Sequence, residues 1–235
     1  MISDKVLAMC ELMNDLLYQK IPESRHGYYV NQSLSIGYQT AGIIKAEFGE
    51  NRAPDMEDLY RKFQIKIEFL EKSSKNCGVS FRAQSEYGKG GSAKVLIYME
   101  SIEMLASKSQ YDLPGETYEG MSRKQALNIH LAHEFFHFLE YKSSMKQGGH
   151  MVDIYDKGYV SDYLEPVPLV SFMGWKRKGS ILRCSEIAAH AFAKELLGLP
   201  VFPNFFDYAY LMNEKRLRPE DFQRMVEENG RALCS

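Results

Sequence analysis

Two histidines one helical turn apart, His133 and His137, are the side chains of this sequence best suited to chemistry. They enclose Glu134 in the pattern H-E-x-x-H. Positions i and i+4 of an α-helix share one face, about 6 Å apart along the axis, so both imidazoles can reach one metal ion. Two histidine ligands favour zinc, and Glu134 beside them suits a general base acting on water. The pattern predicts a hydrolytic zinc centre; the alternative is two surface histidines beside a glutamate.

The motif must be held by a helix, and the sequence predicts one from Arg123 to Tyr141. Ser122 and Gln125 have the spacing of a capping box at its start. Large apolar residues such as Phe135 flank the motif, and a polar cluster in an apolar helix is costly unless it is paired or bound to a ligand. This context favours the zinc centre over the surface histidines.

His130, one turn before His133, falls near the same helix face. It could contact a metal ligand without binding the metal itself, or it could be an ordinary polar residue of the first helical turns. A metal pair made of His130 and His133 is a third possibility. That pair would leave His137 without a role, so it ranks below the H-E-x-x-H pair.

A catalytic zinc site takes a third protein ligand and keeps one position open. The metzincin pattern would place a histidine at 143, where this sequence has Ser143, so that class is excluded. A helix predicted over 181–197 offers Glu186 and His190 on one face, and its alanines allow close packing against the helix of the motif. Both remain candidates for the third ligand. Weaker ones are His150 and Asp153, in the intervening segment.

The remaining pattern predicts helices, then strands, then helices, which is typical of an α+β fold. A helix is expected over 6–17, a loop over 22–38, a helix over 39–48 and another from Pro54. Strands are expected over 65–69, 79–84 and 95–99, the last two forming a hairpin through the glycines at 88, 90 and 91. Loops are expected over 107–121 and 143–180, and helices over 208–213 and 219–228.

The composition limits the classes of function. The chain has 235 residues, with 29 basic and 31 acidic side chains, so nothing suggests direct binding to nucleic acid. The first residues do not have the pattern of a signal peptide. No apolar run reaches the length of about 18 residues that a membrane-spanning segment requires. The four cysteines are scattered, as in reduced proteins of the cytoplasm. We expect a cytoplasmic protein with one domain over 1–235: an N-terminal segment 1–40, a core 41–200 and a helical end 201–235.

Together the motifs resemble the ImmA/IrrE family of zinc metallopeptidases, which is linked to repressor and anti-repressor control in bacteria and their mobile elements. The family pattern has a hairpin ending in an edge strand, an H-E-x-x-H helix and a later helix E-x-E-A-N-x-F-A-x-x-L-L-x-P. Here the strand is Val95 to Met99, and the later helix reads Glu186 to Pro200. Ala188 replaces the second glutamate of the pattern, and His190 stands where Asn or Asp is common. The resemblance covers about residues 40–200.

The resemblance implies a zincin-like domain, with helices packed on a small mixed or antiparallel sheet. It implies zinc as cofactor, with His133, His137 and Glu186 as ligands and Glu134 as general base. It implies hydrolysis of peptide bonds in a protein or peptide substrate, such as a transcriptional repressor. An extended peptide could add to the strand Val95 to Met99 at the edge of the cleft.

The residues leave two questions open. The group that stabilises the oxyanion could be His150, His190 or one of the tyrosines at 155, 159 and 163. The chain could also be a regulatory or interaction module whose zinc is not catalytic, although Glu134 would then have no purpose. A helix-turn-helix DNA-binding regulator is a further alternative, disfavoured by the absence of a basic face.

Overall fold

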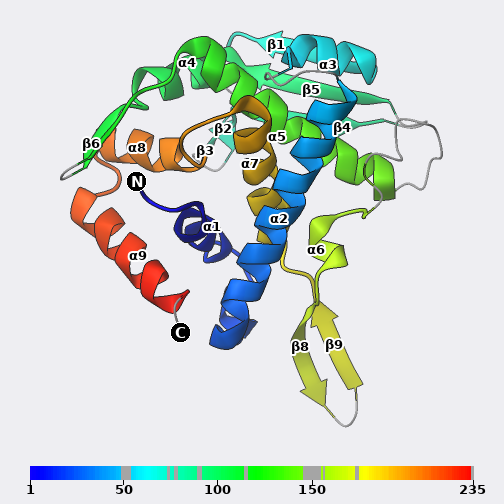
Figure 1. Ribbon diagram of the computed structural model, residues 1–235, viewed down its shortest axis with the longest axis vertical. Helices are drawn as coiled ribbons and strands as arrows, with labels where there is room; N and C mark the ends of the chain where they lie inside the picture. Colours follow the sequence, from blue (N-terminus) through cyan, green and yellow to red (C-terminus); the bar gives the residue numbers. More distant parts are fainter. Residues whose placement is uncertain are drawn as a thin grey trace.

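The computed structural model describes residues 1–48, 54–72, 75–76, 79–88, 92–113, 116–144, 155, 157–172 and 175–233. Within these residues the fold is α+β, as the order of the elements predicts (Figure 1). Helix α7 (Arg183–Leu197) lies at its centre and packs against α2 (Glu23–Glu47) and α5 (Arg123–Ser144). The aromatic side chains that fill this core are fully buried and include Tyr60, Phe135, Phe136, Phe192, Phe202 and Phe205.

One mixed sheet of three strands lies along α5, in the order β1 (Ile65–Leu70), β5 (Ala93–Tyr98), β4 (Ala83–Tyr87). Strand β5 runs parallel to β1 and antiparallel to β4, with Val95 opposite Ile67 and Ser85. The predicted hairpin of the last two strands is therefore present. Its turn at 89–91 lies outside the described residues.

The prediction that Val95 to Met99 forms an edge strand is wrong. Strand β5 is the central strand, and β4 is the edge strand on the side of α5. The burial of the two strands explains the difference. Val95, Leu96 and Ile97 are all buried, as expected for a strand flanked on both sides, whereas burial alternates along β4.

The prediction of a loop over 22–38 is also wrong, because α2 is one continuous helix from Glu23 to Glu47. Its glycines, serines and asparagine are weak helix formers, so local propensity opposed the outcome. Tertiary packing overrides it. A Cβ atom built on Gly37 would lie 2.3 Å from the carbonyl oxygen of Ala188 and 2.7 Å from the Cβ of Ala191. Ala188 and Ala191 of α7 thus allow the close approach of α2. The predicted contact of α7 with α5 is also present, and there Phe192 packs on Phe136.

Other elements differ from expectation mainly at their ends. The capping box before α5 is confirmed, since the Gln125 N–H donates to Ser122 Oγ and the Ser122 N–H donates to Gln125 Oε1. The first helix ends early, because Asp15 accepts from the N–H groups of Leu17 and Arg183 beyond it. The helices that pack around α2, α5 and α7 include α1 (Asp4–Leu12), η1 (Tyr18–Lys20), α3 (Met56–Lys62), α4 (Met99–Ser107), α8 (Phe205–Asn213) and α9 (Pro219–Ala232).

Both long segments expected as loops contain short elements. The first holds the strands β6 (Tyr111–Leu113) and β7 (Glu116–Tyr118). The second holds α6 (Val160–Tyr163) and the hairpin of β8 (Val167–Phe172) and β9 (Trp175–Gly179), which projects from the helices (Figure 1). The strand expected over 79–84 is divided between β4 and β3 (Val79–Ser80), which pairs with β2 (Lys75–Asn76).

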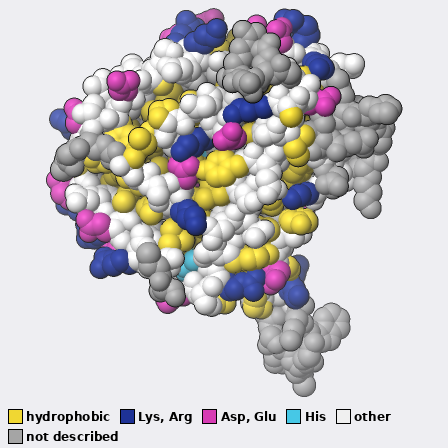
Figure 2. Space-filling model, viewed as in Figure 1, with side chains coloured by type: hydrophobic (Ala, Val, Ile, Leu, Met, Phe, Trp, Pro, Cys, Tyr) yellow, Lys and Arg dark blue, Asp and Glu magenta, His cyan; other side chains and the backbone are white. Residues whose placement is uncertain are grey.

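The surface carries charges of both signs. On the face drawn in Figure 2, basic and acidic side chains are interspersed among polar and apolar ones. No helix within the described ranges combines the length and the apolar character that crossing a membrane requires.

We predict that Gly37→Ala lowers the free energy of unfolding by about 1–3 kcal/mol, because the new methyl group meets backbone atoms of α7 that cannot move aside. Gly42→Ala, in the same helix, is the matched control, since a Cβ there has nothing within 4 Å. It should stabilise by about 0.5–1 kcal/mol through helix propensity. Urea unfolding of both variants measures this, and equal effects would contradict the proposed close packing.

Candidate metal centre

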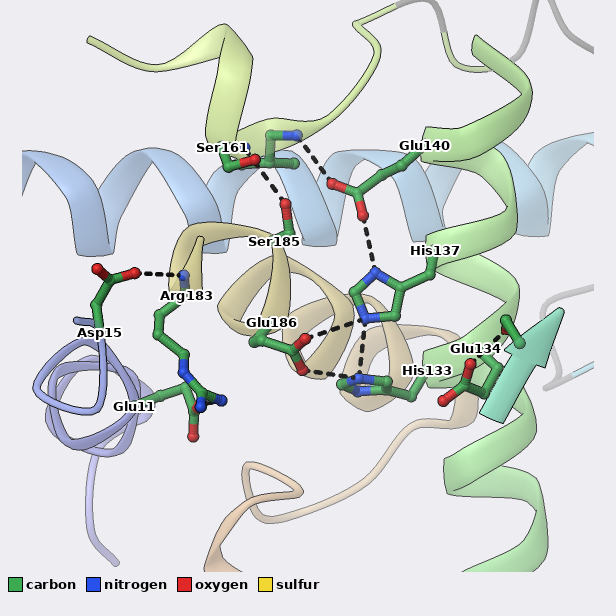
Figure 3. Close-up of polar contacts among 12 residues, drawn as sticks. Glu11, Asp15, His133, Glu134, His137, Glu140, Ser161, Arg183, Ser185 and Glu186 are labelled. Atoms are coloured by element: carbon green, nitrogen blue, oxygen red, sulfur yellow. Dashed lines mark hydrogen bonds and ion pairs between the residues drawn. The ribbon is translucent and has the colours of Figure 1, made fainter. Parts of the chain in front are cut away.

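The side chains predicted to bind metal come together between α5 and α7 (Figure 3). His133 Nε2 lies 3.1 Å from His137 Nε2 and 3.2 Å from Glu186 Oε2. His137 Nε2 lies 3.7 Å from the other carboxylate oxygen, Glu186 Oε1. All three donors lie within 4.8 Å of one another, and each residue is partly buried.

These spacings fit a tetrahedral zinc ion. Zinc bonds of about 2.0–2.2 Å to nitrogen and oxygen place neighbouring ligand atoms about 3.3–3.6 Å apart. The distances of 3.1 Å between the two histidine nitrogens and 3.2 Å from His133 to Glu186 Oε2 lie close to that range, and His137 lies 3.7 Å from Glu186 Oε1. Two imidazole nitrogens facing each other and a carboxylate form a donor set that suits a borderline-soft divalent cation.

The electrostatics of the group also favour a cation. Burial alone would raise the pKa of Glu186, but the hydrogen bonds and charges of His133 and His137 hold it well below its usual range. Burial would lower the pKa of His137, yet hydrogen bonds with Glu140 and Glu186 raise it well above its usual range. The carboxylates therefore stabilise positive charge between the two imidazoles.

Glu140 orients the second histidine, a role that the sequence reasoning missed. Its Oε2 accepts from His137 Nδ1 at 2.8 Å, which directs Nε2 toward the other two donors. Its Oε1 accepts from the Val160 N–H at 2.8 Å, and the side chain is fully buried. The available signal was an acidic residue at i+3 from His137, on the same helix face, in an otherwise apolar stretch.

Glu134 is not one of the three donors, and its carboxylate lies between His133 and the neighbouring strand (Figure 3). The Ser85 hydroxyl, on the edge strand β4, donates to Glu134 Oε2 at 2.5 Å. Tyr87, two residues on, stacks on Tyr141 of α5 at 3.9 Å between ring centroids. The edge strand is thus fixed against α5 beside the candidate general base. Ser85 was not predicted, because no local pattern links it to Glu134.

His190, the other candidate ligand, lies behind His133 rather than among the three donors. The two ring centroids are 4.7 Å apart and the ring planes are inclined at 60°. Its Nδ1 is buried and has no hydrogen-bond partner among the described residues. Burial, together with the neighbouring His133, lowers the pKa of His190 to about 3, so its imidazole is neutral.

His130 also lies outside the donor group. Its Nδ1 donates to the Ala126 carbonyl one turn earlier at 2.8 Å. Burial and the charge of Arg82 lower its pKa to about 4. Of the other candidates, His150 and Asp153 lie outside the described residues. Tyr155 packs on Phe136, and Tyr163 is 56% exposed.

An arginine that the sequence reasoning also missed lies one turn before Glu186. Arg183 Nη1 donates to Glu11 Oε1 at 2.9 Å, and its backbone N–H donates to Asp15 Oδ2 at 2.9 Å (Figure 3). Burial raises the pKa of Glu11, and the charge of Arg183 opposes that shift. These contacts bind α1 to the start of α7 and so fix the end that carries Glu186.

Comparison of the chain with protein-family models, curated proteins and solved structures finds no match. The chemistry of this group is therefore argued from its own residues.

We predict that, with metal removed by a chelator, the protein loses stability as the pH falls from 6 to 5. Burial lowers the pKa of His26, His130 and His190 below 6.5 in the folded protein. As the pH falls, the unfolded chain therefore binds more protons than the folded chain, and the free energy of unfolding decreases. Each histidine contributes a slope of up to about 1.4 kcal/mol per pH unit. The raised pKa of His137 affects the free energy of unfolding only above pH 6.5, where stability decreases as the pH rises.

Urea unfolding between pH 7 and 5 measures the slope. His190→Gln should reduce the slope by the contribution of one proton, up to about 1.4 kcal/mol per pH unit, because glutamine does not titrate. An unchanged slope in that variant would contradict the assignment of a buried neutral imidazole.

Proposed function

We propose that the protein is a zinc-dependent metallopeptidase of the gluzincin type. The observation that carries the proposal is the meeting of His133, His137 and Glu186 around one point, with Glu134 beside them and not among the donors. In a structural zinc site, protein ligands would fill all four coordination positions. Three donors and a neighbouring carboxylate are what a hydrolytic site requires.

Zinc, when bound, would polarise the carbonyl of the scissile bond and make water more acidic. The residues of the chain would do the rest. Glu134 would take a proton from the attacking water and pass it to the leaving amine, a transfer that contributes about 10²–10⁴-fold to such reactions. The Ser85 hydroxyl holds Glu134 Oε2, leaving the other carboxylate oxygen for the proton.

The edge strand β4 would align the substrate. Among the described strands it pairs only with β5, so its other edge can accept an extended peptide by backbone hydrogen bonds. Its contact with Glu134 through Ser85 would place the peptide beside the general base. This assigns to β4 the role that the sequence had suggested for Val95 to Met99.

The nature of the substrate rests on the two motifs alone. Their resemblance to the ImmA/IrrE family supports a protein or peptide substrate, with a transcriptional repressor as our proposal. We propose that the enzyme acts in the cytoplasm, without binding nucleic acid or membrane directly.

We predict that the protein binds about one zinc per chain and that Glu134→Gln keeps the zinc but loses hydrolysis by about 10²–10⁴-fold. Glutamine has the shape of glutamate but cannot accept the proton. Elemental analysis measures zinc, and cleavage of casein and of a mixed peptide library measures activity. His133→Ala should lose the metal.

Three results would overturn parts of the proposal. Zinc uptake that His133→Ala does not change would exclude the metal site. Full activity of Glu134→Gln would exclude the general base. Zinc binding without hydrolysis of either substrate would favour a regulatory module instead.

We predict that Glu140→Gln weakens zinc binding by about 10–100-fold. A glutamine amide cannot accept from both His137 Nδ1 and the Val160 N–H, because one end of it is a donor. The matched control is Glu195→Gln, a partly exposed residue of α7 paired with Lys45. Competition with a chromophoric chelator gives the affinities, and equal values for the two variants would contradict a positioning role.

A further inference from the structure

A cavity of about 210 Å³ lies apart from the three metal donors, between α4, α8 and the start of β4. Two arginines, Arg82 and Arg216, line it together with Asp207 and Tyr210 of α8. Ser101 lines it from α4, and Met104 and Leu211 supply apolar surface. We refer to it as the arginine pocket.

The arginine pocket adjoins the metal centre through two routes. Arg82 immediately precedes β4, whose Ser85 donates to Glu134. Asp207 pairs with Arg82 and is close enough to act electrostatically on His190, whose ring packs on His133. Strand β4 therefore connects the pocket to the side of the metal centre that carries Glu134.

The charges in the pocket leave a net positive excess. Asp207 compensates Arg82, and the guanidinium lies over the Tyr210 ring at 5.6 Å from its centroid. Arg216 forms no ion pair with any residue of the described ranges. Because a guanidinium has five N–H donors, one carboxylate cannot use all the donors of two arginines. Donors remain for an incoming anion.

A buried hydroxyl in the same pocket also lacks a partner. Ser101 is only 4% exposed, and within the described part of the chain its Oγ makes no hydrogen bond. A buried polar group without a partner is costly, so an oxygen of a ligand would relieve that cost. Met104 and Leu211 would contact methylene groups of the same ligand.

We propose that the arginine pocket binds a carboxylate of the peptide substrate, from an acidic side chain or from a C-terminus. The position within the substrate rests on the proposed function. A peptide added antiparallel to β4 would run from Tyr87 toward Arg82, since antiparallel pairing is the more stable arrangement. Arg82 lies three residues from Ser85, at about 3.3 Å per residue. The carboxylate would therefore lie two or three residues beyond the cleaved bond, on its C-terminal side.

Three small probes test binding without any hydrolysis: N-acetyl-glutamate amide, N-acetyl-glutamine with a free carboxylate, and the neutral N-acetyl-glutamine amide. NMR titration of the full chain should show that one carboxylate probe binds about tenfold or more tightly than the neutral probe. The shifts should fall on Tyr210 and Leu211. The better of the two carboxylate probes identifies the source as side chain or C-terminus.

Arg216→Gln should weaken binding of that probe by about tenfold. The matched control is Arg231→Gln, an exposed arginine of α9 away from the pocket, which should leave binding unchanged. Arg82 is not the first choice for substitution, because its loss would leave Asp207 without its partner. Equal binding of all three probes, or equal effects of the two variants, would overturn the pocket.

A second measurement separates this inference from the proposed function. If the zinc-loaded protein cleaves a peptide library, acidic residues or chain ends should be enriched two or three positions after the cleaved bond, and Arg216→Gln should abolish the enrichment. Cleavage without enrichment refutes the pocket and leaves the peptidase intact. Probe binding without cleavage supports the pocket and refutes the peptidase.

Discussion

The close contact of α7 with its two neighbouring helices is the constraint on which the metal centre depends. On one side Ala188 and Ala191 admit α2 at Gly37; on the other, Phe192 packs on Phe136 at 5.5 Å between ring centroids. Small residues facing one helix and a large one facing the other determine where the axis of α7 lies. Because interiors are close-packed, that position cannot drift without opening a void or a clash. The carboxylate of Glu186, in the first turn, is thereby held opposite the two histidines.

The short helix α6 adds a polar tie between the ligand-bearing helices (Figure 3). Glu140 of α5 accepts from the backbone of Val160, and the next N–H, of Ser161, donates to the hydroxyl of Ser185. Ser185 directly precedes Glu186. One path of contacts thus runs from His137 through α6 to the neighbour of the third donor. Such supporting contacts keep donors in register, and for a metal site an error of even 1 Å matters.

The sequence predicted what local spacing determines and missed what distant contacts determine. The H-E-x-x-H face and the helix around it follow from residues within one segment, and Gly198 ends α7 in the left-handed conformation, as expected of a stop signal. Helix α2 was missed because its weak helix formers are stabilised by burial against α7, which no local pattern records. Ser85 was missed for the same reason, since its partner Glu134 lies far along the chain. Glu140 has a local partner in His137, but its second contact, with Val160, lies in a segment without periodicity.

Both departures from the E-x-E-A-N pattern have a physical basis in this packing. Ala188 is fully buried, and its carbonyl lies against Gly37, so a glutamate there would carry its carboxylate into the helix interface. His190 stands where that pattern has Asn or Asp, and its ring packs on that of His133. Its low pKa keeps it neutral, so it adds no second positive charge beside the donors. A neutral imidazole there can pack on His133 without competing with a cation for Glu186, which makes the substitution compatible with a three-ligand metal site.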